Sequence, residues 1–384
     1  MELNEENIKL GIRSLDEDFL NEVFEYFFGE RPLESLARLI IDECERICWS
    51  SNNPVAGQLL AIAYRDGIFR DVDMSRHFQL LKSIESHGRR DTIFALALAY
   101  FQGSGTDKDF EKALEYANRA LILGEPNAYT VIAGVYMLGC DKIEKNEAYA
   151  ADICKKAIRE FSSATAMLLL AEHYICKREY RQALKYAQSA YEHGSMDAAD
   201  IIARAVMLSD FNDVEASWVM GVLQSGASLS KQYCMLLLGN CYLEGDYVER
   251  DEVRGLDLIF QAANSGNGLA NFQLGAFYEQ GEFLTKNQEL AWEHYNKAAC
   301  EGNEFALFKV AKAYLHGYLG QEVDKYSAYL IIVKLCASEN VKDAPFREEL
   351  LEELNYLKAH LPEHIVEETR DYCLSNGFAP LYSM

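Results

Sequence analysis

The chain has 384 residues, of which 49% are hydrophobic and 12% aromatic, so it is too apolar for a disordered protein and long enough for an extended array. Its net charge of −23 argues against nucleic acid and anionic membrane surfaces as partners, because both are bound through clustered Lys and Arg. Only 6 prolines accompany long stretches rich in Ala, Leu and Glu, which favours helices over an all-β build.

The first residues, MELNEENIKL, are acidic and polar, and they lack the basic start and apolar run of a secretory signal. Apolar runs such as 329–333 are far shorter than the roughly 18 residues that span a bilayer. We therefore expect a cytoplasmic protein without membrane insertion. Residues 1–50 hold 13 acidic and 5 basic residues, and residues 1–53 are predicted to form an acidic helical cap.

From residue 54 onward the sequence repeats at intervals of about 36 residues. Each unit is marked by a tyrosine, and these anchors are Tyr64, Tyr100, Tyr136, Tyr174, Tyr242, Tyr278 and Tyr314. A large apolar residue stands four positions before each anchor and a small residue three positions before, as Leu238 and Gly239 do before Tyr242. Positions at this spacing share one face of an α-helix, so each unit should begin with a helix that a neighbour approaches closely.

A glycine follows most anchors by three positions, and an Asp or Asn follows by nine or ten. The glycines are Gly67, Gly103, Gly139, Gly245, Gly281 and Gly317. The acidic or amide residues are Asp73, Asp109, Asn146, Asp251, Asn287 and Asp324. Glycine ends a helix in the left-handed conformation, and Asp or Asn caps the start of the next helix. Each unit is therefore predicted to be a helix hairpin.

One further unit lacks its tyrosine. Between Tyr174 and Tyr242 there is room for two units, and Val206 stands at the anchor position of the second. The eight predicted units cover 54–89, 90–125, 126–163, 164–195, 196–231, 232–267, 268–303 and 304–339, and a helical cap is predicted over 340–384. A single hairpin cannot cover its own apolar face, so consecutive hairpins must stack. The expected fold is all-α, a right-handed α-α superhelix, or solenoid.

The string A-x3-L-[GA]-x2-Y-x2-G, followed by a capped helix with K-A-x2-Y-x2-A-x3-G, resembles the Sel-1-like repeat, a relative of the tetratricopeptide repeat. The resemblance covers residues 54 to about 339 and implies a tetratricopeptide-like solenoid. Some cysteine-rich relatives carry a disulfide in each repeat, and a penicillin-hydrolysing activity has been ascribed to them. Cys300 occupies the first cysteine position of that pattern, but residues 301–310 contain no cysteine. We therefore expect free thiols.

The sequence contains no G-x-S-x-G, GxxxxGK[ST] or HExxH motif. His360 and His364 have the helical spacing of a metal pair, but Pro362 between them predicts a helix break. Cys44 and Cys48 lie one helical turn apart, and no second pair completes a zinc site. We expect a protein that is not an enzyme, with no catalytic residue, no cofactor and no metal.

By analogy with tetratricopeptide arrays, certain positions near each anchor face the inside of the superhelix. We predict that this concave face binds a protein or peptide, and the acidic charge favours a basic one. The predicted contact residues are Arg65, Asp66, Phe94, Phe101, Gln102, Met137, Glu172, Asn240, Glu244, Phe272, Glu279, Gln280, Phe308 and His316. This lining is more apolar than exposure to solvent favours, so the alternative is burial against the next unit.

The leading hypothesis is a non-enzymatic scaffold or adaptor for protein–protein interaction. A first alternative is an acidic immunity-type inhibitor that neutralises a basic toxin or effector, because opposite charges speed association. A second alternative is a β-lactamase-like hydrolase of the kind claimed for the cysteine-rich relatives.

Overall fold

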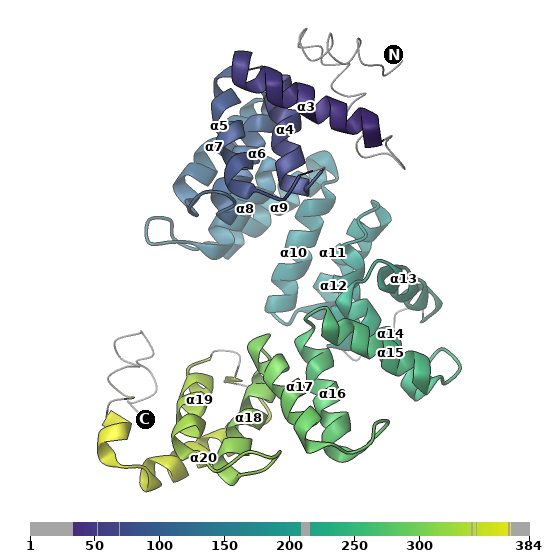
Figure 1. Ribbon diagram of the computed structural model, residues 1–384, viewed down its shortest axis with the longest axis vertical. Coiled ribbons are helices and arrows are strands. Elements are labelled where there is room, and N and C mark those ends of the chain that lie inside the picture. Colours follow the sequence, from purple (N-terminus) through teal and green to yellow (C-terminus); the bar gives the residue numbers. More distant parts are fainter. Residues whose placement is uncertain are drawn as a thin grey trace. The chain divides into compact units, whose positions relative to one another are not determined.

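The computed structural model describes residues 34–51, 53–68, 70–208, 216–338, 341–342, 344–367 and 369. These residues form α-helices and one 3-10 turn, and they contain no β-strand beyond an isolated bridge between Cys140 and Ile143. The fold is thus all-α, an α-solenoid of helix hairpins (Figure 1). The chain divides into two compact units, Met1–Ser195 and Met196–Met384, which are described separately below.

In the first unit, α3 (Glu34–Ser51) packs against the first of four hairpins. The hairpins are α4 (Pro54–Asp66) with α5 (Met74–Ile84) and the turn η1 (Glu85–His87), α6 (Arg90–Gln102) with α7 (Phe110–Ile122), α8 (Ala128–Leu138) with α9 (Glu147–Phe161), and α10 (Ala164–Cys176) with α11 (Tyr180–Glu192). We call the first helix of each hairpin the A helix and the second the B helix. Of the predicted amino-terminal cap, residues 1–33 and 52 lie outside the described residues.

The second unit also contains four hairpins. They are α12 (Ala198–Met207) with α13 (Ala216–Ser228), α14 (Gln232–Glu244) with α15 (Glu252–Asn264), α16 (Gly268–Gln280) with α17 (Gln288–Cys300), and α18 (Glu304–His316) with α19 (Lys325–Ala337). Helix α20 (Arg347–His360) then packs against α19 and ends just before Pro362, where the sequence predicts a break. The last part of the predicted carboxyl-terminal cap, 370–384, lies outside the described residues.

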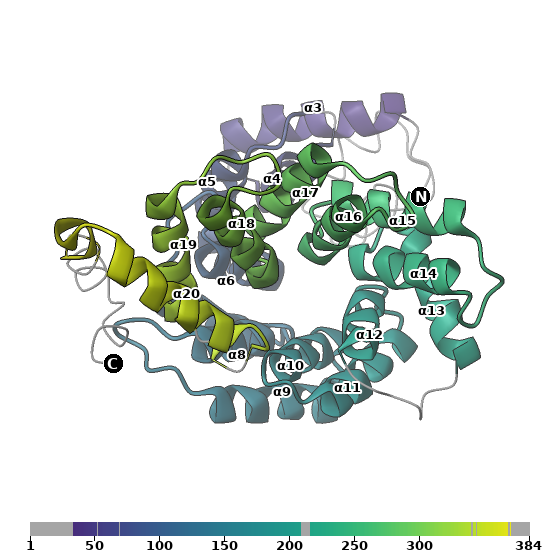
Figure 2. The same cartoon turned by 90° about the horizontal axis from the view of Figure 1, so that it is seen from below.

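Each B helix packs against the A helix of its own hairpin and, within a unit, against the A helix of the next hairpin. Figure 2 shows this order at α9, which lies against both α8 and α10. Every hairpin therefore covers the apolar face that its neighbour cannot cover alone. No described helix is both long and apolar enough to cross a bilayer.

The predicted glycines end most A helices. Gly67, Gly103, Gly245, Gly281 and Gly317 adopt the left-handed conformation, with φ between 68° and 82°. Gly139 differs, because its ψ of 172° sends the chain into a loop that contains the Cys140–Ile143 bridge. The prediction of a positive φ is confirmed there, but the left-handed cap is not.

All six predicted cap residues accept a backbone hydrogen bond at the start of a B helix. Asp109, for example, accepts from the N–H of Lys112 at 3.0 Å. The N–H of Asp109 also donates to the carbonyl oxygen of the anchor Tyr100 at 2.9 Å, and the same bond recurs at the other five caps. One residue thus starts the B helix and ties it to the end of the A helix.

The small residues three positions before the anchors allow close helix contact, as the sequence predicts. A methyl group on Gly275 of α16 would lie 2.8 Å from the Tyr295 ring of α17. A methyl group on Gly239 of α14 would lie 2.9 Å from the carbonyl oxygen of Gly255 on α15. These distances are too short for any side chain, so glycine is required where the two helices of these hairpins meet.

Polar contacts also join the B helices of consecutive hairpins. Glu85 accepts hydrogen bonds from the Tyr116 hydroxyl at 2.8 Å and from Nη1 of Arg119 at 3.0 Å, and it pairs with Lys82. Partial burial alone raises the pKa of Glu85, but the bonds from Lys82, Tyr116 and Arg119 outweigh burial and lower this pKa to about 2. The carboxylate therefore stabilises the contact between α5 and α7.

One substitution is predicted to have opposite effects at two helical glycines. Gly275→Ala should lower the free energy of unfolding by about 1–3 kcal/mol, because the added methyl group overlaps the Tyr295 ring. Gly221→Ala on the exposed side of α13 meets no atom within 4 Å and should raise that free energy by up to about 1 kcal/mol. Denaturant unfolding of both variants measures the difference, and equal effects would contradict the packing described here.

The Glu85 cluster predicts a specific acid sensitivity. The pKa of Glu85 is about 2 in the folded chain against an ordinary value of 4.5, so its contribution is complete above about pH 4.5 and is lost as the pH falls toward 2. In Glu85→Gln this contribution is absent at every pH. Melting temperatures measured from pH 7 to pH 2.5 should show wild type above the variant at neutral pH and the two converging in acid. A constant gap would show that the carboxylate charge is irrelevant.

Candidate interaction surface

The carboxyl-terminal ends of the A helices carry many of the predicted contact residues. Arg65 and Asp66 end α4, Gln102 ends α6, and Gln280 ends α16. A left-handed glycine follows each of these ends and its N–H bonds back to the helix, so the last turn is held in place. The sequence thus presents these side chains from fixed positions rather than from loops.

In the first unit, Arg65, Asp66 and Gln102 are exposed and Glu172 on α10 is half-buried. Nε of Arg65 donates to Oδ1 of Asp66 at 2.6 Å, and this bond is the main reason why the pKa of Asp66 is lowered. Gln102 accepts a bond of 3.3 Å from the hydroxyl of Ser104. Arg65, Asp66 and Gln102 therefore lie on the surface, and the role of all four residues in partner binding stays a prediction.

The apolar residues predicted in the first unit are largely used in packing. Phe94, Phe101 and Met137 are partly buried against the core. The ring of Phe101 stacks on Phe110 with 5.6 Å between centroids, and its far end lies 2.7 Å from where a methyl group on Gly134 would sit. Phe101 therefore reaches from α6 to the next A helix, α8, and fills the space left by that glycine.

In the second unit, polar contacts join successive A helices. Nε2 of Gln273 on α16 donates to Oδ1 of Asn240 on α14 at 2.7 Å. Glu279 on α16 accepts from Nζ of Lys309 on α18 at 3.1 Å and from the Tyr295 hydroxyl at 2.6 Å. Asn240 and Glu279, which the sequence predicts as contact residues, thus bond to neighbouring hairpins.

Three further polar residues predicted in the second unit are exposed. His316 lies at the end of α18, with Nε2 3.1 Å from Oε1 of Glu353 on α20. Glu244 ends α14 and Gln280 ends α16. Partial burial, followed by the nearby carboxyl group of Asp246, raises the pKa of Glu244 above its usual value. This rise indicates a carboxylate whose neighbours do not neutralise it.

The two aromatic residues predicted in the second unit belong to core clusters. Phe308 is 5% exposed and stacks on Phe346, with 4.9 Å between ring centroids. Phe272 is partly buried and contacts Tyr295 and Phe305 at 5.6 and 6.1 Å between centroids. For Phe308 the structure favours the alternative stated above, burial against the next element, because a ring enclosed in this way cannot line an open groove.

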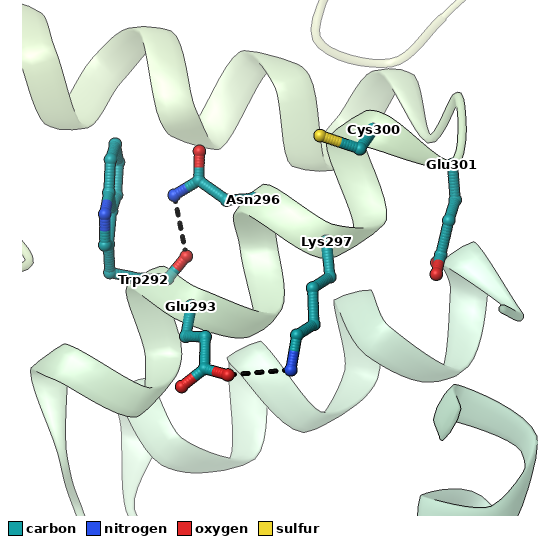
Figure 3. Close-up of a pocket in the computed structure, with 6 residues that line it drawn as sticks. All are labelled: Trp292, Glu293, Asn296, Lys297, Cys300 and Glu301. Atoms are coloured by element: carbon teal, nitrogen blue, oxygen red, sulfur yellow. Dashed lines mark hydrogen bonds and ion pairs between the residues drawn. The ribbon is translucent and has the colours of Figure 1, made fainter. Parts of the chain in front are cut away.

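The sequence reasoning did not single out a hollow of about 490 Å³ on the surface of α17 (Figure 3). It is lined by Trp292, Glu293, Asn296, Lys297, Cys300 and Glu301. Figure 3 shows Trp292, Asn296 and Cys300 along one side of the helix, at a spacing of four residues that the sequence already contains. The polar groups are used locally, since Lys297 donates to Glu293 at 2.7 Å and Asn296 donates to the carbonyl oxygen of Trp292 at 2.9 Å.

Three of the groups that could act as nucleophiles or bases are buried in the fold. Burial raises the pKa of the Cys154 and Cys234 thiols to about 12, so neither forms a thiolate near neutral pH. His77 is buried, and its Nδ1 lies 2.8 Å from the carbonyl oxygen of Ala61. Among the described residues, no group of three or more His, Cys, Asp and Glu is placed to hold a metal ion.

A substitution of Phe308 tests whether this ring is buried in the core or lines an open groove. Phe308→Ala should lower the free energy of unfolding by about 3–5 kcal/mol, because it leaves a cavity beside Phe346. Gln280→Ala, at an exposed helix end, should change it by less than about 0.5 kcal/mol. Unfolding by denaturant measures both, and a Phe308 variant with unchanged stability would place this ring on an open surface instead.

The Sel1 repeat family matches five segments of the chain, 91–125, 164–195, 232–267, 268–303 and 305–330. A comparison with curated protein sequences finds no match. Each of the five segments falls on one described hairpin, and the segment 232–267, for example, contains α14 and α15.

Three solved structures illustrate the likeness in fold. The chain is similar to a protective antigen with an SLR fold from uropathogenic Escherichia coli, at 18% identity over 99% of this chain and 95% of that chain, with a TM-score of 0.40. A Sel1 repeat protein from Oxalobacter formigenes is similar at 23% identity over 78% and 88%, with a TM-score of 0.47. An immunity protein from Pseudomonas aeruginosa is similar at 18% identity over 71% and 83%, with a TM-score of 0.29. None of these scores reaches 0.5, so they carry no argument about function. The five matching segments and the hairpins on which they fall show that the chain contains Sel1 repeats.

Proposed function

We propose that the protein is a non-enzymatic interaction scaffold that binds another protein, or a peptide segment of one, along the exposed ends of its A helices. The observation that carries this proposal is that apolar and polar side chains on those helices have different environments. Their large apolar side chains pack against the next element of the chain, as Phe101 and Phe308 do, whereas polar side chains such as Gln102 and Gln280 stay exposed at capped ends. A surface fixed in this way loses little conformational entropy when a partner binds.

The chemistry of the described residues supports a role in binding rather than catalysis. General acid–base and nucleophilic catalysis need an accessible group whose pKa suits the reaction. Here Tyr295 is fully buried and donates to Glu279, and Nδ1 of the partly buried His294 lies 2.9 Å from Oδ1 of Asn271. These contacts join neighbouring helices and leave the groups committed to the fold.

The charge of the chain supports a basic partner. The net charge of −23 comes from 60 acidic and 37 basic residues, so the surface as a whole attracts Lys and Arg on an approaching protein. Complementary charge of this kind raises the association rate and disfavours acidic competitors. We therefore propose, more specifically, a cytoplasmic scaffold that selects basic partners.

Two matched variants test the scaffold proposal. Glu244→Lys with Gln280→Lys changes two exposed A-helix ends, and Asp257→Lys with Gln261→Lys makes the same change in charge on the exposed side of the B helix α15. Proteins captured from native extract by each variant are quantified by mass spectrometry. We expect the A-helix variant to capture at least about tenfold less of a partner that the wild type captures, because like charges are placed at the contact. The B-helix variant should capture as much of it as the wild type does.

Melting temperatures provide the control for this experiment. All four side chains are exposed, so both double variants should melt within a few degrees of the wild type. Equal retention of every partner by the two variants, with unchanged melting, would contradict binding at the A-helix ends.

A further inference from the structure

We draw no further inference here: the strongest candidate, the hollow of about 490 Å³ beside Trp292, Asn296 and Cys300 on α17, is an open surface on one helix, and nothing in the structure shows what covers it.

Discussion

The residue that closes each hairpin loop determines how the two helices of the hairpin meet. At Asp251, the side chain accepts from the N–H of Arg254 while the backbone N–H donates to the carbonyl oxygen of Tyr242, at 3.0 and 2.9 Å. The same pair of bonds starts the B helix and fixes it to the last turn of the A helix. Once this geometry is set, the small residues of the A helix fall opposite the B helix. The contact of Gly239 with Gly255 follows from that register.

The sequence was sufficient for the local parts of this fold because each part depends on a few residues close together in the chain. A glycine three positions after the anchor must allow a positive φ, and an Asp or Asn before a helix can accept an N–H bond. Gly139 shows the limit of such reasoning. Its φ is positive as predicted, but its ψ of 172° differs from that of Gly317, although the loops after the two glycines have the same length. The value of ψ therefore cannot be predicted from the glycine and the loop length alone. The hydrogen bond from the N–H of the cap residue to the carbonyl oxygen of the anchor could not be predicted either, because a bond between backbone groups does not depend on the identity of the side chains.

The candidate surface was less predictable, because exposure depends on residues far away in the sequence. The helical period gives the direction in which Phe308 points but not that Phe346 covers it, 38 positions later. Phe101 has the same ambiguity, and its burial depends on Gly134 in the following hairpin. The polar helix ends were easier to predict, since a residue next to a left-handed glycine has no neighbour on its own helix to cover it. Trp292 and its hollow carried a signal in the spacing to Asn296 and Cys300, which is equally typical of a packed helix.

These features together describe a protein whose useful property is a fixed surface. Hydrogen bonds such as that from Gln273 to Asn240 hold hairpins together, and exposed polar groups such as Gln102 and Gln280 lie at the ends of A helices. The account depends most directly on the cap-to-anchor bond that holds each loop. Amide hydrogen exchange at Asp73, Asp109, Asp251 and Asp324 measures this bond, since each N–H is its donor. Exchange as slow as in the middle of the flanking helices is the predicted result. Exchange as fast as in an exposed loop would contradict the account, because the hairpins would then lack the constraint that aligns them.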